Sequence, residues 1–190
     1  MYNHSSKAQV EYSLRQLSAG LFFLLGTSPF EKITVTDICR QAGITRRTFY
    51  RNCENKTDLI LYSTDYLVSH LLQSVDFQSR DPRMLYQGFF RYWYRHRQFL
   101  GLLYKNNLFP VFQNEFIRVC NESMRYPLQE QHLAAAANRS KMQLFSNAFV
   151  VGGLGQMLRQ WAEEDFSSSP EEVAGAILFL APGDQRNLCD

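Results

Sequence analysis

The spacing of apolar residues near the beginning of the chain limits its fold more than any other feature. Five of them recur at steps of four, three, four and three residues: Val10, Leu14, Leu17, Leu21 and Leu24. This spacing places them on one face of an α-helix, which we expect from about Lys7 to Gly26. Similar steps continue along the chain and no alternating strand pattern competes, so the sequence predicts an all-α protein of roughly eight to ten helices.

Residues 33–52, ITVTDICRQAGITRRTFYRN, predict two short helices joined by a tight turn. Thr36 precedes Asp37 and a short apolar set, which predicts a capped helix beginning there. Gly43 is expected to end this helix, because glycine adopts the left-handed conformation at little cost. Thr45 is a suitable cap for the next helix, from Arg46 to about Asn52.

Packing across this turn would divide the second helix into two faces. If Ile38 and Ala42 pack on Ile44 and Phe49, the two helices cross steeply, as in a helix-turn-helix. The other side of the second helix then faces outward and would fit a DNA major groove about 12 Å wide. Its outward residues are Arg46, Arg47, Thr48, Tyr50 and Arg51.

The distribution of charge favours this interpretation over a merely solvated pair of helices. The chain of 190 residues has a net charge of only +2. However, Lys32 to Lys56 contains six basic residues against Asp37 and Glu54, whereas residues 61–190 carry 12 basic and 13 acidic groups. Positive charge is therefore concentrated in the first third, as an anionic partner would require.

The remaining segments also follow helical signals. Asn55 is a suitable cap for a fourth helix that runs toward Val75, and a long helical segment is expected from about Leu133 to Ala162. A break is expected near Pro110. Ser169, Pro170 and two glutamates at 171–172 predict the beginning of the last helix, with a capping serine, proline at the first position and acid in the first turn.

The stretch ITVTDICRQAGITRRTFYRNCENKTDLI, preceded by a helix and SPFEK, resembles the DNA-binding domain of the TetR family of bacterial transcription regulators. T-V-x-D-I, A-G-I-T, T-F-Y and K-x-D-L all fall at the family's spacing over about fifty residues. The resemblance implies a recognition helix carrying Arg46, Arg47, Thr48 and Tyr50. It also implies that Lys56, at the start of the fourth helix, holds a phosphate, with Thr36 and Thr45 as further phosphate contacts.

One position departs from the family's pattern. This chain has Cys53 where the family usually has an aromatic residue. The packing of the recognition helix on the fourth helix depends on this position, and a cysteine can be buried there as a small hydrophobic residue.

The resemblance implies a three-helix DNA-binding domain over residues 1–57 and a larger helical domain for effector binding and dimerisation over 58–190. A face shared by Phe89, Phe90, Trp93 and Arg97 would suit either a core or a ligand pocket. Glycines within a helical pattern indicate close approach of another helix. The predicted dimer interface therefore contains Gly152, Gly153, Leu154, Val173, Ile177 and Leu178, with packing inside one chain as the alternative.

Other function classes find little support in the sequence. The four cysteines are scattered, His70, His96 and His132 are too dispersed for a metal or catalytic group, and no nucleophile motif occurs. We therefore expect no metal, no cofactor and no enzymatic activity. Apolar runs are too short to span a bilayer, so we expect a cytoplasmic protein without membrane contact.

The predicted function is a sequence-specific regulator of transcription. We expect a repressor that binds a palindromic operator in double-stranded DNA as a homodimer and responds to a small-molecule effector. The alternative is a protein-interaction module or co-activator that keeps the fold without an operator or effector of its own.

Overall fold

The computed structural model describes residues 4–77, 79, 81–125 and 136–179. This part consists of nine α-helices and one short 3₁₀ helix, contains no strand, and confirms the all-α prediction. The elements are α1 (His4–Leu25), η1 (Phe30–Lys32), α2 (Val35–Ala42), α3 (Arg46–Asn52), α4 (Asp58–Ser74), α5 (Pro82–Arg95), α6 (Arg97–Lys105), α7 (Phe109–Arg125), α8 (Ala136–Glu163) and α9 (Pro170–Phe179). The expected beginning of the long segment, near Leu133, lies outside the described residues.

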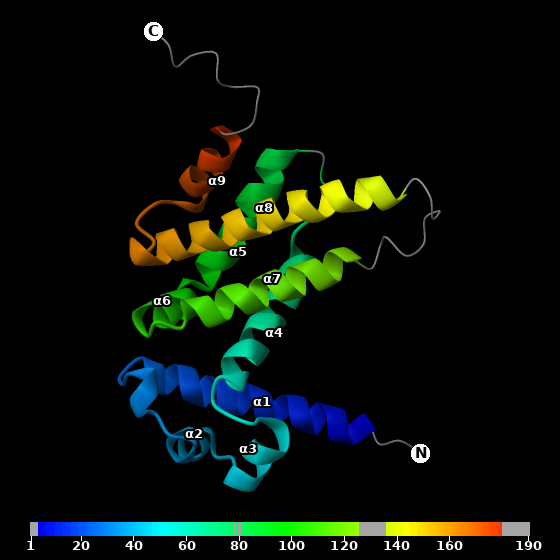
Figure 1. Ribbon diagram of the computed structural model, residues 1–190. Coiled ribbons are helices and arrows are strands. Elements are labelled where there is room, and N and C mark those ends of the chain that lie inside the picture. Colours follow the sequence, from blue (N-terminus) through cyan, green and yellow to red (C-terminus); the bar gives the residue numbers. More distant parts are fainter. Residues whose placement is uncertain (1–3, 78, 80, 126–135, 180–190) are drawn as a thin grey trace.

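A small unit of α1, α2 and α3 lies at one end of the molecule, and the larger group of α5 to α9 meets it where α1 contacts α6 (Figure 1). Leu21 of α1, Ile38 of α2 and Phe49 of α3 are fully buried in its core. Gly20 allows α1 and α2 to cross closely, since a Cβ atom there would be 3.2 Å from the Ile38 carbonyl oxygen and 3.3 Å from the Ala42 side chain. A larger residue at this crossing would push the two helices apart.

Two helix beginnings differ from their predictions. Thr34, rather than Thr36, caps α2, because its hydroxyl accepts from the Asp37 N–H and the Asp37 carboxylate accepts from the Thr34 N–H, both at 3.1 Å. This reciprocal pair needs a spacing of three residues. The fourth helix begins at Asp58, and Asn55 instead forms a turn before it, where its side chain accepts from the Thr57 N–H at 2.8 Å.

Other helix ends agree with the sequence. Gly43 has a φ of 64° and ends α2 in the left-handed conformation. Pro110 lies in the first turn of α7, where a missing N–H is tolerated. Ser169 begins α9 in the predicted way: its hydroxyl accepts from the Glu172 N–H, and the Glu172 carboxylate accepts from the Ser169 N–H at 2.7 Å.

The larger unit is built around an aromatic core. Trp93 of α5 is fully buried and makes edge-on contacts with Phe112 and Phe116 of α7 at ring centroid distances of 5.3 and 6.2 Å. Phe90 meets Trp161 of α8 edge-on at 5.7 Å. Such offset and edge-on pairs are the favourable arrangements for aromatic rings, and they join α5, α7 and α8 into one core.

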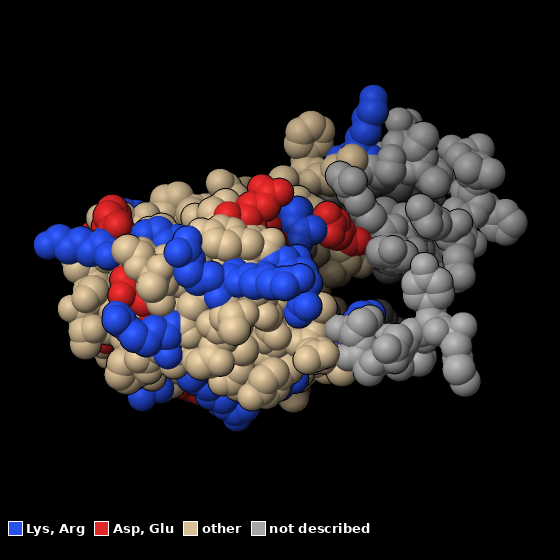
Figure 2. Space-filling model, turned by 90° about the horizontal axis from the view of Figure 1, so that it is seen from below, with Lys and Arg blue, Asp and Glu red and all other residues tan. Residues whose placement is uncertain are grey.

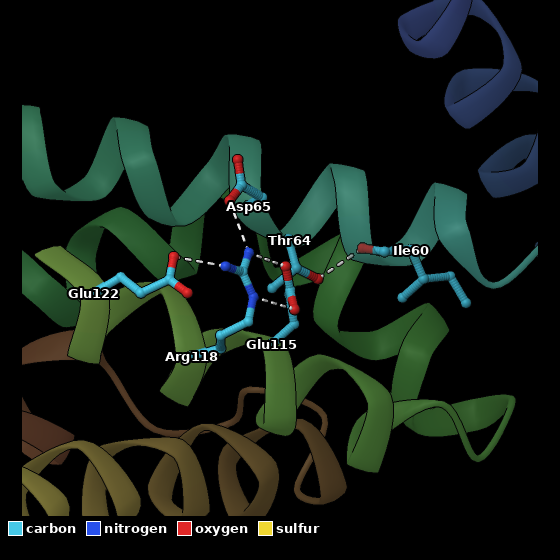
Figure 3. Close-up of polar contacts among 6 residues, drawn as sticks. All are labelled: Ile60, Thr64, Asp65, Glu115, Arg118 and Glu122. Atoms are coloured by element: carbon cyan, nitrogen blue, oxygen red, sulfur yellow. Dashed lines mark hydrogen bonds and ion pairs between the residues drawn. The ribbon is translucent and has the colours of Figure 1, made fainter. Parts of the chain in front are cut away.

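Helix α4 connects the two units and packs on both α1 and α7. Near its middle, Asp65 accepts from the Arg118 guanidinium of α7 at 3.2 Å. Figure 3 shows that the same guanidinium also pairs with Glu115 and Glu122, each at 2.6 Å. One arginine therefore shares its charge among three carboxylates and ties α4 to α7.

A second connection runs from α6 to the small unit. The Asn106 side chain accepts from the Phe30 N–H at 3.0 Å and donates to the Leu25 carbonyl oxygen at 3.4 Å. It thereby satisfies backbone groups in the segment between α1 and α2. None of the described helices is both long and apolar enough to span a bilayer.

Candidate nucleic-acid interface

The turn between α2 and α3 fixes the angle at which α3 leaves the small unit. At Gly43 the chain reverses, and the Ile44 N–H donates to the Cys39 carbonyl oxygen at 3.0 Å. Thr45 then caps α3 as predicted, because its hydroxyl accepts from the Thr48 N–H at 3.2 Å. Both ends of the turn are satisfied by local hydrogen bonds, so α3 is held in one orientation.

Helix α3 has one inward side chain and a polar outer face. Phe49 is fully buried against Ile38 and the rest of the small core, whereas Tyr50 is 53% exposed. The Arg46 guanidinium lies over the Tyr50 ring, 5.9 Å from its centroid. Arg46, Arg47 and Arg51 are all exposed, and Thr48 is half-buried between the two faces. The structure therefore brings the predicted recognition residues onto one helix.

The face that carries α2 and α3 is rich in basic groups. Figure 2, which views the molecule from this end, shows Lys and Arg side chains across the middle of the face. Arg40 of α2 is bound to Asp37 at 2.6 Å, so its charge is partly neutralised. Hydrogen bonds from the Thr34 hydroxyl and N–H, with the Arg40 charge, hold the pKa of Asp37 below its usual value. The arginines of α3 have no such acidic partner among the described residues.

Thr36 and Thr45, the two further predicted phosphate contacts, differ in the surroundings of their hydroxyl groups. Thr36 is exposed in the first turn of α2. Thr45 is also exposed, but its hydroxyl is already used in capping and lies 3.0 Å from that of Thr48. Both lie at the beginning of a helix, where unpaired N–H groups favour an anion.

Lys56 precedes α4 in the chain, and its ammonium group is already bound. Its ammonium group donates to the carbonyl oxygens of Phe30, Glu31 and Ile33, at 2.8 Å for Ile33, and lies 4.2 Å from the Phe30 ring centroid. An ammonium has three N–H donors, and these bonds use all of them. The structure thus gives Lys56 the task of holding the segment before α2, and a phosphate contact would require breaking these bonds.

Cys53 fills its position as a buried apolar residue. Its side chain belongs to the core, and its N–H donates to the Phe49 carbonyl oxygen at 2.8 Å, at the end of α3. Burial, with smaller contributions from Asp58 and Cys39, raises the pKa of the Cys53 thiol to about 11. The thiol therefore stays protonated near neutral pH and packs as a small hydrophobic side chain.

The four residues of the predicted ligand pocket separate into two groups. Phe89, Phe90 and Trp93 are buried and in contact with other rings, so a ligand among them would have to displace an aromatic side chain. Arg97 points outward, donates to the Tyr94 carbonyl oxygen at 3.0 Å and lies over the Tyr94 ring. The shared face is a packed core with Arg97 at its edge.

The predicted dimer residues also differ in position. Leu154 is buried in its own chain, and Val173 and Ile177 pack partly on the same core. Leu178 is half-buried, Gly152 half-buried and Gly153 exposed. Open space surrounds both glycines, whereas Gly155 meets Gln113 of α7 at 3.4 Å from a Cβ position. Close helix packing at this glycine cluster within the chain therefore occurs at Gly155.

An exposed apolar row in the first half of α8 was missed by sequence reasoning. Met142, Phe145 and Phe149 are 74%, 77% and 80% exposed. Their steps of three and four residues place them on one side of the helix, and this spacing was the signal available in the sequence. Among the described residues, no group of three or more His, Cys, Asp or Glu side chains could hold a metal ion.

Comparisons with known proteins agree with this architecture. A family model described as the C-terminal region of TetR transcriptional regulators matches residues 81–183. No curated protein sequence matches the chain significantly. A solved TetR transcriptional regulator from Streptococcus agalactiae 2603V is similar in fold, with a TM-score of 0.57 and 18% identity over 93% of this chain and 97% of that chain. The family match covers more than half of the sequence, and the chain therefore belongs to the TetR family of transcription regulators.

Proposed function

We propose that the protein binds a specific palindromic operator as a homodimer, with α3 in the major groove, and that it represses transcription from that site. The observation that carries this proposal is the outer face of α3, where three exposed arginines and Tyr50 lie over the buried Phe49. A polyanion would supply the missing partners of these charges.

The side chains of α3 suit different parts of a DNA site. Arg46 and Arg47, near the beginning of the helix, can form bidentate hydrogen bonds with guanine edges, and the Thr48 methyl group can contact thymine. Arg51, Tyr50 and the hydroxyls of Thr36 and Thr45 suit phosphate oxygens. We assign Lys56 to positioning the segment before α2, because its three donors are occupied.

The exposed row of α8 supports homodimerisation. Three large apolar side chains at least 74% exposed on one helix are expensive to leave in water and typical of a protein contact. We propose that Met142, Phe145 and Phe149 meet the same row of a second copy, with the open glycines Gly152 and Gly153 continuing that contact. A two-fold axis would then present two α3 helices to half-sites about 34 Å apart.

Selection from random duplex DNA tests this proposal directly. The full-length protein should enrich a palindrome whose half-sites lie about one helical turn apart. A double substitution, Arg46→Ala with Arg47→Ala, should abolish enrichment, whereas the matched pair Arg95→Ala with Arg97→Ala on the other unit should retain it. Failure of the unsubstituted protein to enrich any sequence would contradict the proposal and favour the protein-interaction alternative.

The repressor role needs a separate measurement. The selected operator, placed over a promoter that drives a reporter, should give lower expression when the protein is present. Higher expression would indicate an activator with the same DNA contact. Unchanged expression with an occupied operator would contradict a regulatory role at that position.

A further inference from the structure

A groove of about 350 Å³ lies between α1 of the small unit and the connecting helix α4. One wall is formed by three rings at steps of four residues along α4. Tyr62 and Tyr66 are stacked with centroids 6.5 Å apart, and Tyr66 and His70 are 4.5 Å apart. The groove therefore has a continuous aromatic wall at the junction between the two units.

This wall already accepts a positive charge from within the protein. The Arg15 guanidinium of α1 lies 5.6 Å from the centroid of the Tyr66 ring. The same guanidinium pairs with Glu11 at 3.2 Å. The face of an aromatic ring attracts cations through its quadrupole, and Arg15 shows that the geometry of Tyr66 permits such a contact.

Asp65, which borders the groove, belongs to a cluster of side chains with a net negative charge. Asp65 lines the groove and also pairs with Arg118 at 3.2 Å, whereas Glu115 and Glu122 approach that guanidinium at 2.6 Å (Figure 3). Three carboxylates around one guanidinium leave two uncompensated negative charges. A cation at Asp65 would reduce this excess, and Arg118 would keep two closer partners.

The remaining polar groups of the groove are compatible with an amine. The Tyr62 hydroxyl is buried, and the Arg15 side chain faces it. Burial and the Glu11 charge raise the pKa of Tyr62, and the charge of Arg15 and its side-chain hydrogen bond with Tyr62 offset part of this effect, so the oxygen is a neutral phenol that can accept an N–H from a ligand as well. Lys7 and Arg15 both oppose a cation in the groove, but Lys7 is exposed and therefore well screened, and Arg15 is paired with Glu11.

We propose that this groove binds a flat organic cation, with its ring against Tyr62, Tyr66 and His70 and its amine between Asp65 and the Tyr62 hydroxyl. The site is separate from the filled aromatic core of the larger unit. Because it lies between α1 and α4, its occupant can favour one arrangement of the two units and so act as the effector. This regulatory step rests on the proposed DNA-binding function, whereas binding itself does not.

Isothermal titration calorimetry on the full-length protein without DNA tests the binding. The probes are 1-naphthylmethylamine, which is cationic, and 1-naphthylacetate, which carries a similar ring system and an anion. The amine should bind at least tenfold more tightly than the acetate. Equal affinities, preference for the acetate, or no binding of the amine at about 1 mM would overturn the proposal.

Two substitutions locate the amine within the groove. Asp65→Asn should weaken binding of the amine about tenfold, whereas the matched control Asp165→Asn, at an exposed surface position, should leave it unchanged. Tyr62→Phe should weaken the primary amine about threefold to tenfold but leave its N,N,N-trimethyl derivative unaffected, since that derivative has no N–H. Tyr12→Phe, on the exposed part of α1, is its control.

Each variant must first show the unfolding midpoint of the unsubstituted protein, so that a loss of affinity reports on the groove. Unchanged affinity in a folded Asp65→Asn protein would overturn the assigned position of the amine. The final measurement is operator affinity with and without the saturating amine. A change of at least threefold is expected, and no change would overturn the effector role while leaving the calorimetric result standing. Absence of operator binding without ligand would instead count against the proposed function.

Discussion

Helix α3 and the first half of α8 each expose a cluster of similar side chains, but the two clusters are of opposite kinds. On α3 the exposed groups are arginines, and a single ring, Phe49, points inward. On α8 the exposed groups are the apolar Met142, Phe145 and Phe149. Clustered unpaired charge favours a polyanion, whereas clustered apolar area favours another protein surface. The two helices therefore indicate two different partners, and each can be altered without the other.

The largest effect is expected from removing the inward side chain of α3. Phe49→Ala should lower the free energy of unfolding by about 3–5 kcal/mol, because it leaves a cavity between α2 and α3. Urea denaturation followed by circular dichroism measures this loss. Tyr50→Ala, on the exposed side, is the control and should change stability by less than about 0.5 kcal/mol. Equal losses in the two variants would mean that α3 is not divided into an inner and an outer face.

The apolar row of α8 gives the next largest effect. Phe145→Asp combined with Phe149→Asp should weaken dimerisation by about 3 kcal/mol or more. Each substitution removes an apolar ring from the proposed interface and places there a carboxylate that must be desolvated. Sedimentation velocity would show a monomer, and circular dichroism would show unchanged helical content. Phe23→Asp, at an exposed apolar position on α1, should leave the dimer intact. A persistent dimer in the double variant would place the contact on another surface.

Removing one outward charge from α3 should affect DNA binding alone. Arg46→Ala should weaken operator binding by about 1–3 kcal/mol if its guanidinium contacts a base, and unfolding should be nearly unchanged because the side chain is exposed. A titration at fixed salt concentration measures the affinity. Arg95→Ala, also exposed but on α5, is the matched control. Identical operator affinities of the two variants would show that Arg46 does not contact a base.

Substitutions of Lys56 and Arg51 distinguish a structural role from a contact with a DNA phosphate. Lys56→Met should destabilise the fold by about 1–2 kcal/mol, because it removes the ammonium donor from the Ile33 carbonyl oxygen and leaves the Phe30 carbonyl oxygen with only the Ile33 N–H. The salt dependence of operator binding should stay the same. Arg51→Met, in contrast, should lower the slope of log affinity against log salt by about one. A similar decrease of this slope for Lys56→Met would show that Lys56 does contact a phosphate.

The helix-turn-helix was predictable because its signals are local. Gly43, Thr45 and Phe49 each act within a few residues of their own position, and the structure has them as expected. The errors at Thr36 and Asn55 arose where two polar residues compete for one helix end. Only the reciprocal bonds of Thr34 with Asp37 decide the first case, and a carboxylate at Asp58 that accepts two N–H groups decides the second.

The larger unit was less predictable because periodicity shows which residues share a face but not what covers that face. Phe89 and Trp93 satisfy the pattern of a pocket and of a core equally well, and only the rings of distant helices show that the space is filled. Leu154 and Phe149 are both apolar residues of α8, yet one is buried and the other exposed. Long-range packing decides such cases, and it is not encoded in a short window of sequence.

The Asn106 contact has a mechanical consequence for any signal that reaches the DNA-binding unit. This side chain fixes the segment between α1 and α2 to α6, while α4 packs on α1 of the same unit. Because the unit is held both at Asn106 and by α4, we expect a movement of α4 to rotate it about the Asn106 contact instead of translating it. A displacement of α4 should therefore be converted into a rotation of α3 about Asn106, which changes the tilt of the recognition helix as well as its distance from a second copy.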